Sequence, residues 1–240
     1  LVGSEMCIRD RHGKMRYPKL HADKLKIVIF DWDNTLAETR TPLIYAVNRV
    51  LKEYGLPEWK EVKKLRDNNL SFRDNFPRIF GSRADEAYRK YAEIYLRSVA
   101  GLISTFAGTH EVLSWLKRRH VRLAIMTNKD RRLLEFELPL LFRPDIFDRV
   151  VCGHEALHDK PYPEHALYTL RGFVEPADVS PETVWIVGDS PQDSVCACAV
   201  NALPIRIGHP IWGDEEEYAE NILHYDTFLD FYHDLQEIRA

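Results

Sequence analysis

The chain has 240 residues, of which 45% are hydrophobic and 29% are charged, a composition typical of a globular protein with one large domain or a core and a smaller insert. Its 33 basic and 37 acidic side chains give a net charge of −4, so no basic surface indicates binding to nucleic acid. No apolar run approaches the roughly 18 residues that a membrane-spanning helix needs. The four cysteines form neither a disulfide framework nor a zinc motif. We therefore expect a cytoplasmic protein that acts neither on nucleic acid nor in a membrane.

Residues 1–14 carry mixed charges and no apolar segment, so they do not resemble a secretory signal. The run from 2 to 11 resembles translated adapter sequence rather than part of a fold. We expect residues 1–14 to be a non-native or disordered leader and Met15 to be the natural start.

The apolar run 27–30, Ile-Val-Ile-Phe, is typical of a strand that is buried on both faces. It leads directly into Asp31 and Asp33, and because buried carboxylates need partners, the strand must end there. The carboxyl edge of an open α/β sheet is where ligands bind. Side chains two residues apart in extended backbone point the same way, so both acids can face one bound group. An ordinary Asp/Asn turn after a strand is the alternative at this point.

Residues 40–100 have apolar side chains at helical spacing and no strand signal. The first helix is expected to be capped by Thr41 or its neighbour. The predicted helices cover about 42–54, 58–66, 71–80 and 83–99. Because a crossover between parallel strands usually needs only one helix, we predict a helical cap over 40–100 and a core formed by 15–39 and 101–240.

Helices and strands are predicted to alternate from residue 109 onward. The predicted helices are 109–119, 130–138, 164–171, 192–201 and 227–238, and the predicted strands are 121–126, 149–152, 183–187 and 204–207. Thr109 is expected to cap the first of these helices, and Pro139 is expected to end the second. This alternation predicts an α/β fold with a doubly wound, mostly parallel sheet.

Polar residues recur where the later strands end. Thr127 and Asn128 precede a helix N-terminus, which suits an anion, although Thr127 could equally be a helix cap. Lys160 is followed by two prolines that would hold its ammonium in one place, although solvated lysines in loops are commoner. Asp189 follows another buried strand, and Asp193 begins the next helix. Carboxylates from two strand ends are hard oxygen ligands, which suit Mg²⁺.

Four segments occur in a fixed order along the chain, and they read Asp31-x-Asp33-x-Thr35, Thr127, Lys160-Pro161 and Gly188-Asp189-x-x-x-Asp193. Together they resemble the four motifs of the haloacid dehalogenase-like hydrolases. The resemblance covers roughly residues 24–210. It implies a Rossmann-like core with a helical cap inserted after the first motif, which agrees with the predicted insert at 40–100.

The resemblance also implies a division of labour in catalysis. In the family, the first aspartate attacks a phosphoryl group and becomes an aspartyl-phosphate, and that role falls on Asp31. Asp33 would protonate the leaving oxygen and later activate water. Thr127, Asn128 and Lys160 would hold the phosphoryl oxygens, Asn128 through its backbone N–H, and Lys160 would also balance the charge of Asp31.

A Mg²⁺ site is implied at the same edge of the sheet. The ion would be held by Asp31, the backbone carbonyl of Asp33 and Asp189. Asp193 would bind it through water or orient its ligands. Asn34 stands where the family most often has glycine, but asparagine tolerates a positive φ, so the turn can survive.

Asp33 also distinguishes between branches of the family, because true dehalogenases and phosphonate-cleaving members lack an acid at that position. We therefore expect a Mg²⁺-dependent phosphatase for a small phosphorylated metabolite, similar to phosphoglycolate phosphatase. A phosphomutase of the β-phosphoglucomutase type shares every core motif, and a non-catalytic phosphate-binding or partner-binding protein is the alternative outside enzymes. The sequence indicates neither the substrate nor the oligomeric state; Arg66, Arg73 and Arg78 in the cap could meet a second anionic group or only solvent.

Overall fold

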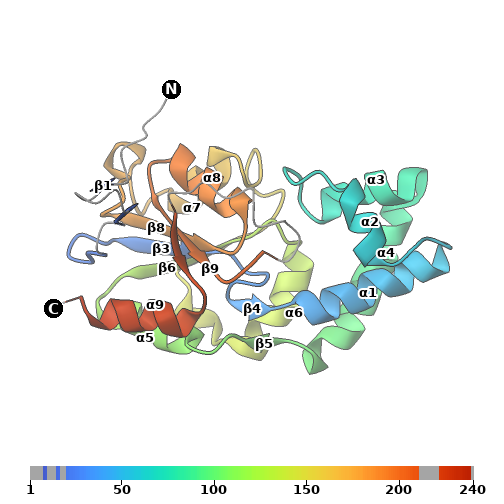
Figure 1. Ribbon diagram of the computed structural model, residues 1–240, viewed down its shortest axis with the longest axis horizontal. Helices are drawn as coiled ribbons and strands as arrows, with labels where there is room; N and C mark the ends of the chain where they lie inside the picture. The colour runs from blue at the N-terminus through green and yellow to red at the C-terminus, as the bar shows by residue number, and fades with distance from the viewer. Residues whose placement is uncertain (1–7, 10–14, 17–19, 211–221, 239–240) are drawn as a thin grey trace.

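The computed structural model describes residues 8–9, 15–16, 20–210 and 222–238. Six strands form one sheet in the order β10–β9–β8–β3–β6–β7, and every neighbouring pair is parallel (Figure 1). Their bounds are β3 Ile27–Phe30, β6 Arg122–Met126, β7 Arg149–Val151, β8 Val184–Gly188, β9 Leu203–Ile207 and β10 Leu223–Tyr225. The predicted leader 1–14 lies outside the described residues, apart from Ile8–Arg9 (β1), which pairs antiparallel with Met15–Arg16 (β2).

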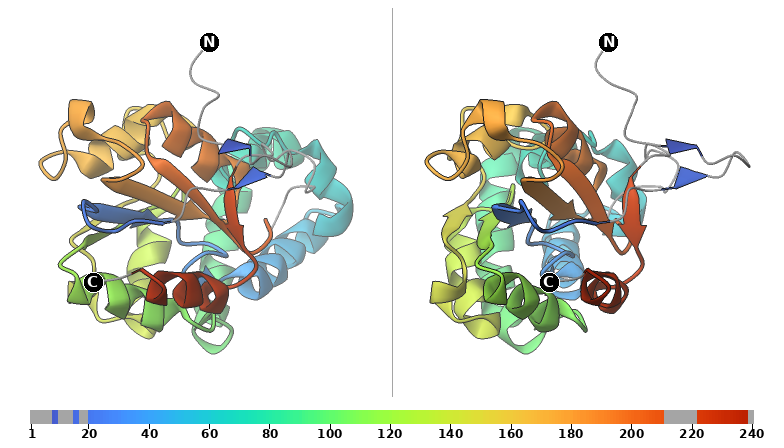
Figure 2. Two further views of the ribbon diagram at one scale, coloured as in Figure 1. Left: turned by 60° about the vertical axis from the view of Figure 1, so that its left-hand side comes forward. Right: turned by 90° about the vertical axis from the view of Figure 1, so that its left-hand side faces the viewer.

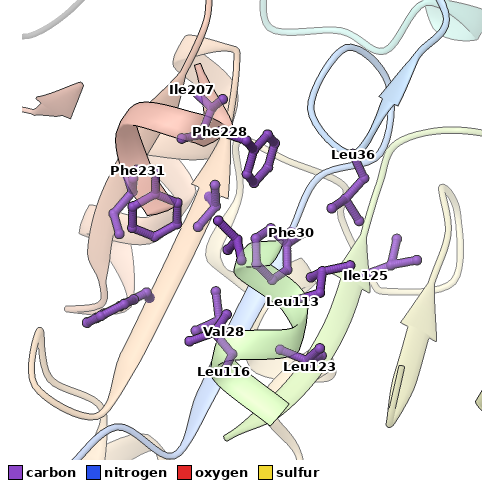
Figure 3. Close-up of a cluster of buried hydrophobic side chains, with 14 of the residues drawn as sticks. Val28, Phe30, Leu36, Leu113, Leu116, Leu123, Ile125, Ile207, Phe228 and Phe231 are labelled. Carbon is purple, nitrogen blue, oxygen red and sulfur yellow. The ribbon is translucent and has the colours of Figure 1, made fainter. Parts of the chain in front are cut away.

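Helices cover both faces of the sheet, as Figures 1 and 2 show. The helices of the core are α5 Thr109–Arg118, α6 Arg131–Leu141, α7 Pro163–Leu170, α8 Pro191–Ala199 and α9 Phe228–Gln236. Side chains of β3 alternate between the two faces. Val28 and Phe30 pack with residues of α5 and α9, as Figure 3 shows, whereas Ile27 and Ile29 pack with residues of α7 and α8. Burial on both faces explains why this strand is apolar throughout.

The segment between β3 and α5 forms a separate helical layer. Its α-helices are α1 Arg40–Glu53, α2 Trp59–Val62, α3 Phe76–Phe80 and α4 Ala84–Ser98, joined by short 3₁₀ turns. They enclose their own hydrophobic cluster, which Leu133 of α6 also joins. The chain enters and leaves this layer through Ala37–Glu38 (β4) and Ser104–Thr105 (β5), which pair antiparallel. The predicted α/β fold, a Rossmann-like doubly wound parallel sheet with an inserted all-helical cap, is confirmed. The limits 15–39, 40–100 and 101–240 stay a prediction.

Three local predictions are wrong. Helix α1 begins at Arg40, so Thr41 lies inside it and does not cap it. Helix α6 continues through Pro139 to Leu141, because a proline so close to a helix end removes only one hydrogen bond of the last turns. The N-cap of α5 is Gly108 rather than Thr109; Gly108 has φ +89°, and a Cβ there would lie 2.6 Å from the backbone nitrogen of Leu229.

Strand β10, at the edge of the sheet, was not predicted, because three residues carry too little periodicity. Among the described residues, no helix combines the length and the apolar character that crossing a bilayer requires.

Candidate active site

The carboxyl ends of β3, β6 and β8 bring the predicted site residues together. Phe30, the last residue of β3, is in register with Ile125 of β6 on one side and Val187 of β8 on the other. Because the three strands are parallel and end within one residue of the same level, the residues that follow them emerge at one edge. Asp31, Thr127 and Asp189 are these residues, and all three are buried and line one cavity.

Lys160 reaches this edge from the loop between β7 and α7. Its Nζ lies 2.7 Å from Oδ1 of Asp31 and 2.6 Å from Oδ1 of Asp193, and all three side chains are buried. Burial alone would lower the pKa of Lys160, but the carboxylates of Asp193 and Asp31 outweigh it and raise the pKa above its usual range. Lys160 is therefore a permanent cation between two acids.

Asn128 fixes the backbone that carries Lys160. Its Oδ1 accepts the Lys160 N–H at 3.0 Å, and its Nδ2 donates to the Lys160 carbonyl at 2.8 Å. The sequence motif placed Asn128 beside the phosphoryl group, and the structure adds this clamp between β6 and the lysine loop. Asn128 therefore positions Lys160 through the lysine backbone and leaves the ammonium to pair with Asp31 and Asp193.

Burial disfavours the ionised form of Asp31 even though the Lys160 ammonium lies beside it. Burial raises its pKa to about 7, an effect that the ammonium of Lys160 opposes and the carboxylate of Asp193 reinforces. A further positive charge beside Asp31 would favour its ionised form. The surroundings of Asp31 would therefore suit a bound cation in addition to the ammonium of Lys160.

Three buried carboxylates supply a site for such a cation. One oxygen each from Asp31, Asp189 and Asp193 lies within 4.8 Å of the others. Asp189 accepts a hydrogen bond from Asn34 Nδ2 at 3.0 Å, and Asn34 has φ +58°, as expected for the residue that replaces the usual glycine. Asp193 accepts from the backbone N–H and the hydroxyl of Ser190. Hard oxygen donors of this kind fit Mg²⁺.

Gly188 makes room for the Asp193 carboxylate. A Cβ on Gly188 would lie 2.2 Å from Cγ of Asp193. We expect Gly188→Ala to cost about 1–3 kcal/mol of the free energy of unfolding, or more, because the displaced group is buried and hydrogen-bonded. Thermal unfolding measures this cost. Gly101→Ala is the matched control, because nothing lies within 4 Å of a Cβ there. Equal unfolding temperatures for both variants would contradict the expected clash.

The carboxylate of Asp33 lies outside the three-acid group and is bound by residues that sequence reasoning missed. Its Oδ1 lies 2.7 Å from Nζ of Lys129, which also lies 2.9 Å from Oε1 of Glu137. Lys129 donates to the hydroxyl of Tyr95 in the cap at 3.1 Å. The indole N–H of Trp32 donates to Oε2 of Glu137 at 2.5 Å.

A signal for Glu137 is present in the sequence. It follows Leu133 and Leu134 at helical spacing, so it lies on the apolar face of α6, and it is completely buried. An acid on such a face must find a cation or a hydrogen-bond donor inside the protein. The helical spacing cannot identify that partner, because Lys129 follows β6 and Trp32 follows β3, and neither lies in α6.

The cavity at this edge has a volume of about 120 Å³ and is closed on one side by the cap. Its walls include Asp31, Asp33 and Lys160 from the core and Arg66 and Tyr88 from the cap. Cap and core touch around its rim: Arg73 pairs with Asp130 at 3.3 Å, His154 contacts Asp74 at 3.2 Å, and Gln192 donates to the Asn68 carbonyl at 2.6 Å.

Comparison with known proteins agrees with this geometry. The sequence model of the family described as haloacid dehalogenase-like hydrolase matches residues 28–205. The chain belongs to this family. Among curated relatives, pyrophosphatase PpaX of Bacillus mycoides (strain KBAB4) is 29% identical over 172 residues, which are 72% of this chain and 78% of that protein.

Solved structures show the same fold. CbbY from Rhodobacter sphaeroides in complex with phosphate has a TM-score of 0.73 at 22% identity, over 88% of this chain and 99% of that chain. A putative β-phosphoglucomutase from Thermotoga maritima has a TM-score of 0.70 at 22% identity, over 90% of this chain and 100% of that chain. The predicted family and the prediction of an enzyme that hydrolyses phosphoric esters are confirmed. The fold does not distinguish a phosphatase from a phosphomutase.

Proposed function

We propose that this haloacid dehalogenase-like hydrolase is a Mg²⁺-dependent phosphatase that hydrolyses a small phosphorylated metabolite through an aspartyl-phosphate on Asp31. The observation that supports it best is the place of Asp31: it is buried at the end of the central strand, faces a cavity, and lies 2.7 Å from the Lys160 ammonium. A carboxylate that is fixed and desolvated in this way can act as a nucleophile toward phosphorus.

The proposed reaction has two steps, the formation of the aspartyl-phosphate and its hydrolysis. An oxygen of Asp31 attacks phosphorus, the bond to the leaving oxygen breaks, and Asp33 gives that oxygen a proton. Asp33 then takes a proton from water, whose oxygen attacks the same phosphorus and releases phosphate and free Asp31. Thr127, the backbone N–H of Asn128 and Lys160 stabilise the charge on the phosphoryl oxygens.

The proposed metal ligands are Asp31, Asp189 and the backbone carbonyl of Asp33, with Asp193 acting through water or orienting the others. Bound Mg²⁺ would neutralise negative charge on the transferring phosphoryl group. The three buried carboxylates near one another support this assignment. The alternatives remain a phosphomutase and a non-catalytic phosphate-binding or partner-binding protein, and the intact set of acids argues against the second.

The size of the cavity supports a small substrate. Its volume of about 120 Å³ is well below the roughly 300 Å³ at which pockets for larger ligands begin. Phosphoglycolate-like esters and, from the name of the PpaX relatives, pyrophosphate are therefore the first candidate substrates. The cytoplasm stays the predicted location of the protein.

Removal of the metal tests the proposal. We expect EDTA to lower the release of phosphate from 4-nitrophenyl phosphate by at least about a hundredfold, because Mg²⁺ contributes several kcal/mol to the transition state. Excess Mg²⁺ should restore the rate. The same assay over a panel of small phosphate esters and pyrophosphate identifies the substrate. Activity that is indifferent to EDTA would remove the metal from the mechanism, and transfer of phosphate to a second hydroxyl would favour the mutase.

A further inference from the structure

A buried ring of polar contacts holds the loop that carries the two proposed catalytic aspartates, and the proposed reaction gives no role to three of its members, Lys129, Glu137 and Trp32. Asp33 pairs with Lys129 at 2.7 Å, Lys129 pairs with Glu137 at 2.9 Å, and Glu137 accepts from Trp32 at 2.5 Å. Trp32 is the residue immediately before Asp33, so the contacts return to the loop on which they begin. Glu137 and Trp32 are completely buried, and Lys129 is almost so.

This ring fixes the direction of the Asp33 side chain. Lys129 is the only ion-pair partner of Asp33 among the residues that the structure describes, and its own side chain is 5% exposed, against 25% for Asp33. A lysine in solvent has many rotamers, but Glu137 and Tyr95 leave the ammonium of Lys129 one position. Lys129 is therefore the more firmly held partner of the pair, and its ammonium fixes the carboxylate of Asp33, which is more exposed and lines the cavity.

Tyr95 connects the ring to the cap. Its hydroxyl accepts from Lys129 at 3.1 Å, and its aromatic ring lies 4.7 Å from the same ammonium. Tyr95 belongs to α4, whereas Lys129 and Glu137 belong to the core. The position of Lys129 therefore depends on the cap as well as on the sheet. A buried ion pair adds little to the free energy of unfolding compared with apolar residues of equal volume. A contribution to stability alone therefore does not account well for this ring.

We propose that Lys129, fixed by Glu137 of the core and Tyr95 of the cap, is a positioning residue that aims the carboxyl group of Asp33 at the leaving oxygen. This inference rests on the proposed function, because it requires Asp33 to be the proton donor. It assigns no contact with substrate to Glu137 or Tyr95. Their effect on the reaction passes through Lys129, and Tyr95 makes proton transfer sensitive to the place of the cap.

The test uses the leaving group. A substrate with a poor leaving group, phenyl phosphate, needs the proton of Asp33, whereas 2,4-dinitrophenyl phosphate does not. In Glu137→Gln we expect kcat/KM for phenyl phosphate to fall at least about tenfold more than kcat/KM for 2,4-dinitrophenyl phosphate, because a misplaced donor costs most where protonation matters most. A ring that serves only the fold would lower both values by the same factor.

Two further variants cover the case in which Glu137→Gln does not fold. Lys129→Met/Glu137→Gln removes the two deeply buried charges together. It leaves only Asp33 without its ion-pair partner, and because the Asp33 side chain is 25% exposed to solvent, the variant should fold and show the same dependence on the leaving group. Tyr95→Phe removes only a hydroxyl and should show a smaller effect of the same kind. Lys90→Met is the matched control, because Lys90 also lies between two acids, Glu53 and Glu86, but outside the cavity.

Asp33→Asn separates failure of this inference from failure of the proposed function. If Asp33→Asn depends on the leaving group and the ring variants do not, Lys129 has no positioning role and the inference is wrong. If Asp33→Asn itself slows both substrates equally, Asp33 is not the proton donor, and both the inference and that part of the proposed function are wrong. A ring variant that reproduces the pattern of Asp33→Asn supports the inference.

Discussion

Asp31→Asn is expected to lower the hydrolysis of 4-nitrophenyl phosphate at saturating Mg²⁺ by at least about 10³-fold, because the amide has the shape of the carboxylate but is no nucleophile. The oxygen of the new amide can still accept from Lys160, so the surroundings of the site should persist. Phosphate release under steady state measures the loss. A rate of phosphate release from Asp31→Asn within tenfold of that of the unchanged protein would refute the assignment of Asp31 as nucleophile.

Stability measurements separate this loss of activity from unfolding. Because burial raises the pKa of Asp31 to about 7, its ionised form is unfavourable in the folded chain without metal. A neutral amide removes that cost, so the unfolding temperature of Asp31→Asn in EDTA should equal or exceed that of the unchanged protein. Asp178→Asn is the matched control, since it neutralises an exposed carboxylate outside the cavity and should leave both activity and stability unchanged.

The parts of the site that the sequence predicts are those encoded by neighbouring residues. Asp31 and Asp189 each follow a buried apolar strand. Because a carboxylate inside the sheet would lack partners, each acid must lie where its strand ends, at the carboxyl edge of the sheet. Parallel alternation then places these ends side by side. The structure confirms this convergence, and the catalytic roles stay predictions.

The contacts that sequence reasoning missed join residues far apart in the chain. Trp32 and Glu137 are 105 positions apart, and Asn128 and Lys160 are 32 apart. Their pairing depends on how closely α6 and the lysine loop approach the sheet, and periodicity carries no information on that distance. The same holds for Gly108, where the backbone of α9 lies so close that a Cβ would clash with it. Local patterns therefore predict which groups reach the site, but not what holds them there.

Lys160→Met carries the largest expected loss of stability. It leaves Asp31 and Asp193 without the ammonium that lies between them, and removal of one partner of a buried ion pair costs about 3–5 kcal/mol. For a chain of this size, that loss lowers Tm by roughly 6–20 °C. Thermal unfolding at pH 8 in EDTA measures it. The control Lys24→Met removes a similarly short but exposed pair with Glu182 and should leave Tm almost unchanged, because solvent screens that pair.

The loss of stability in Lys160→Met should shrink as the pH falls. The pKa of Asp31 already lies above its usual 3.8 in the folded protein, and without Lys160 it rises further. Between these values the folded chain keeps a proton that the unfolded chain has lost, so acidification from pH 8 to pH 5.5 favours the folded state. Mg²⁺ at pH 8 should restore part of the loss, because a cation that binds only the folded site stabilises it. A deficit that changes neither with pH nor with Mg²⁺ would mean that Lys160 contributes packing rather than charge at this site.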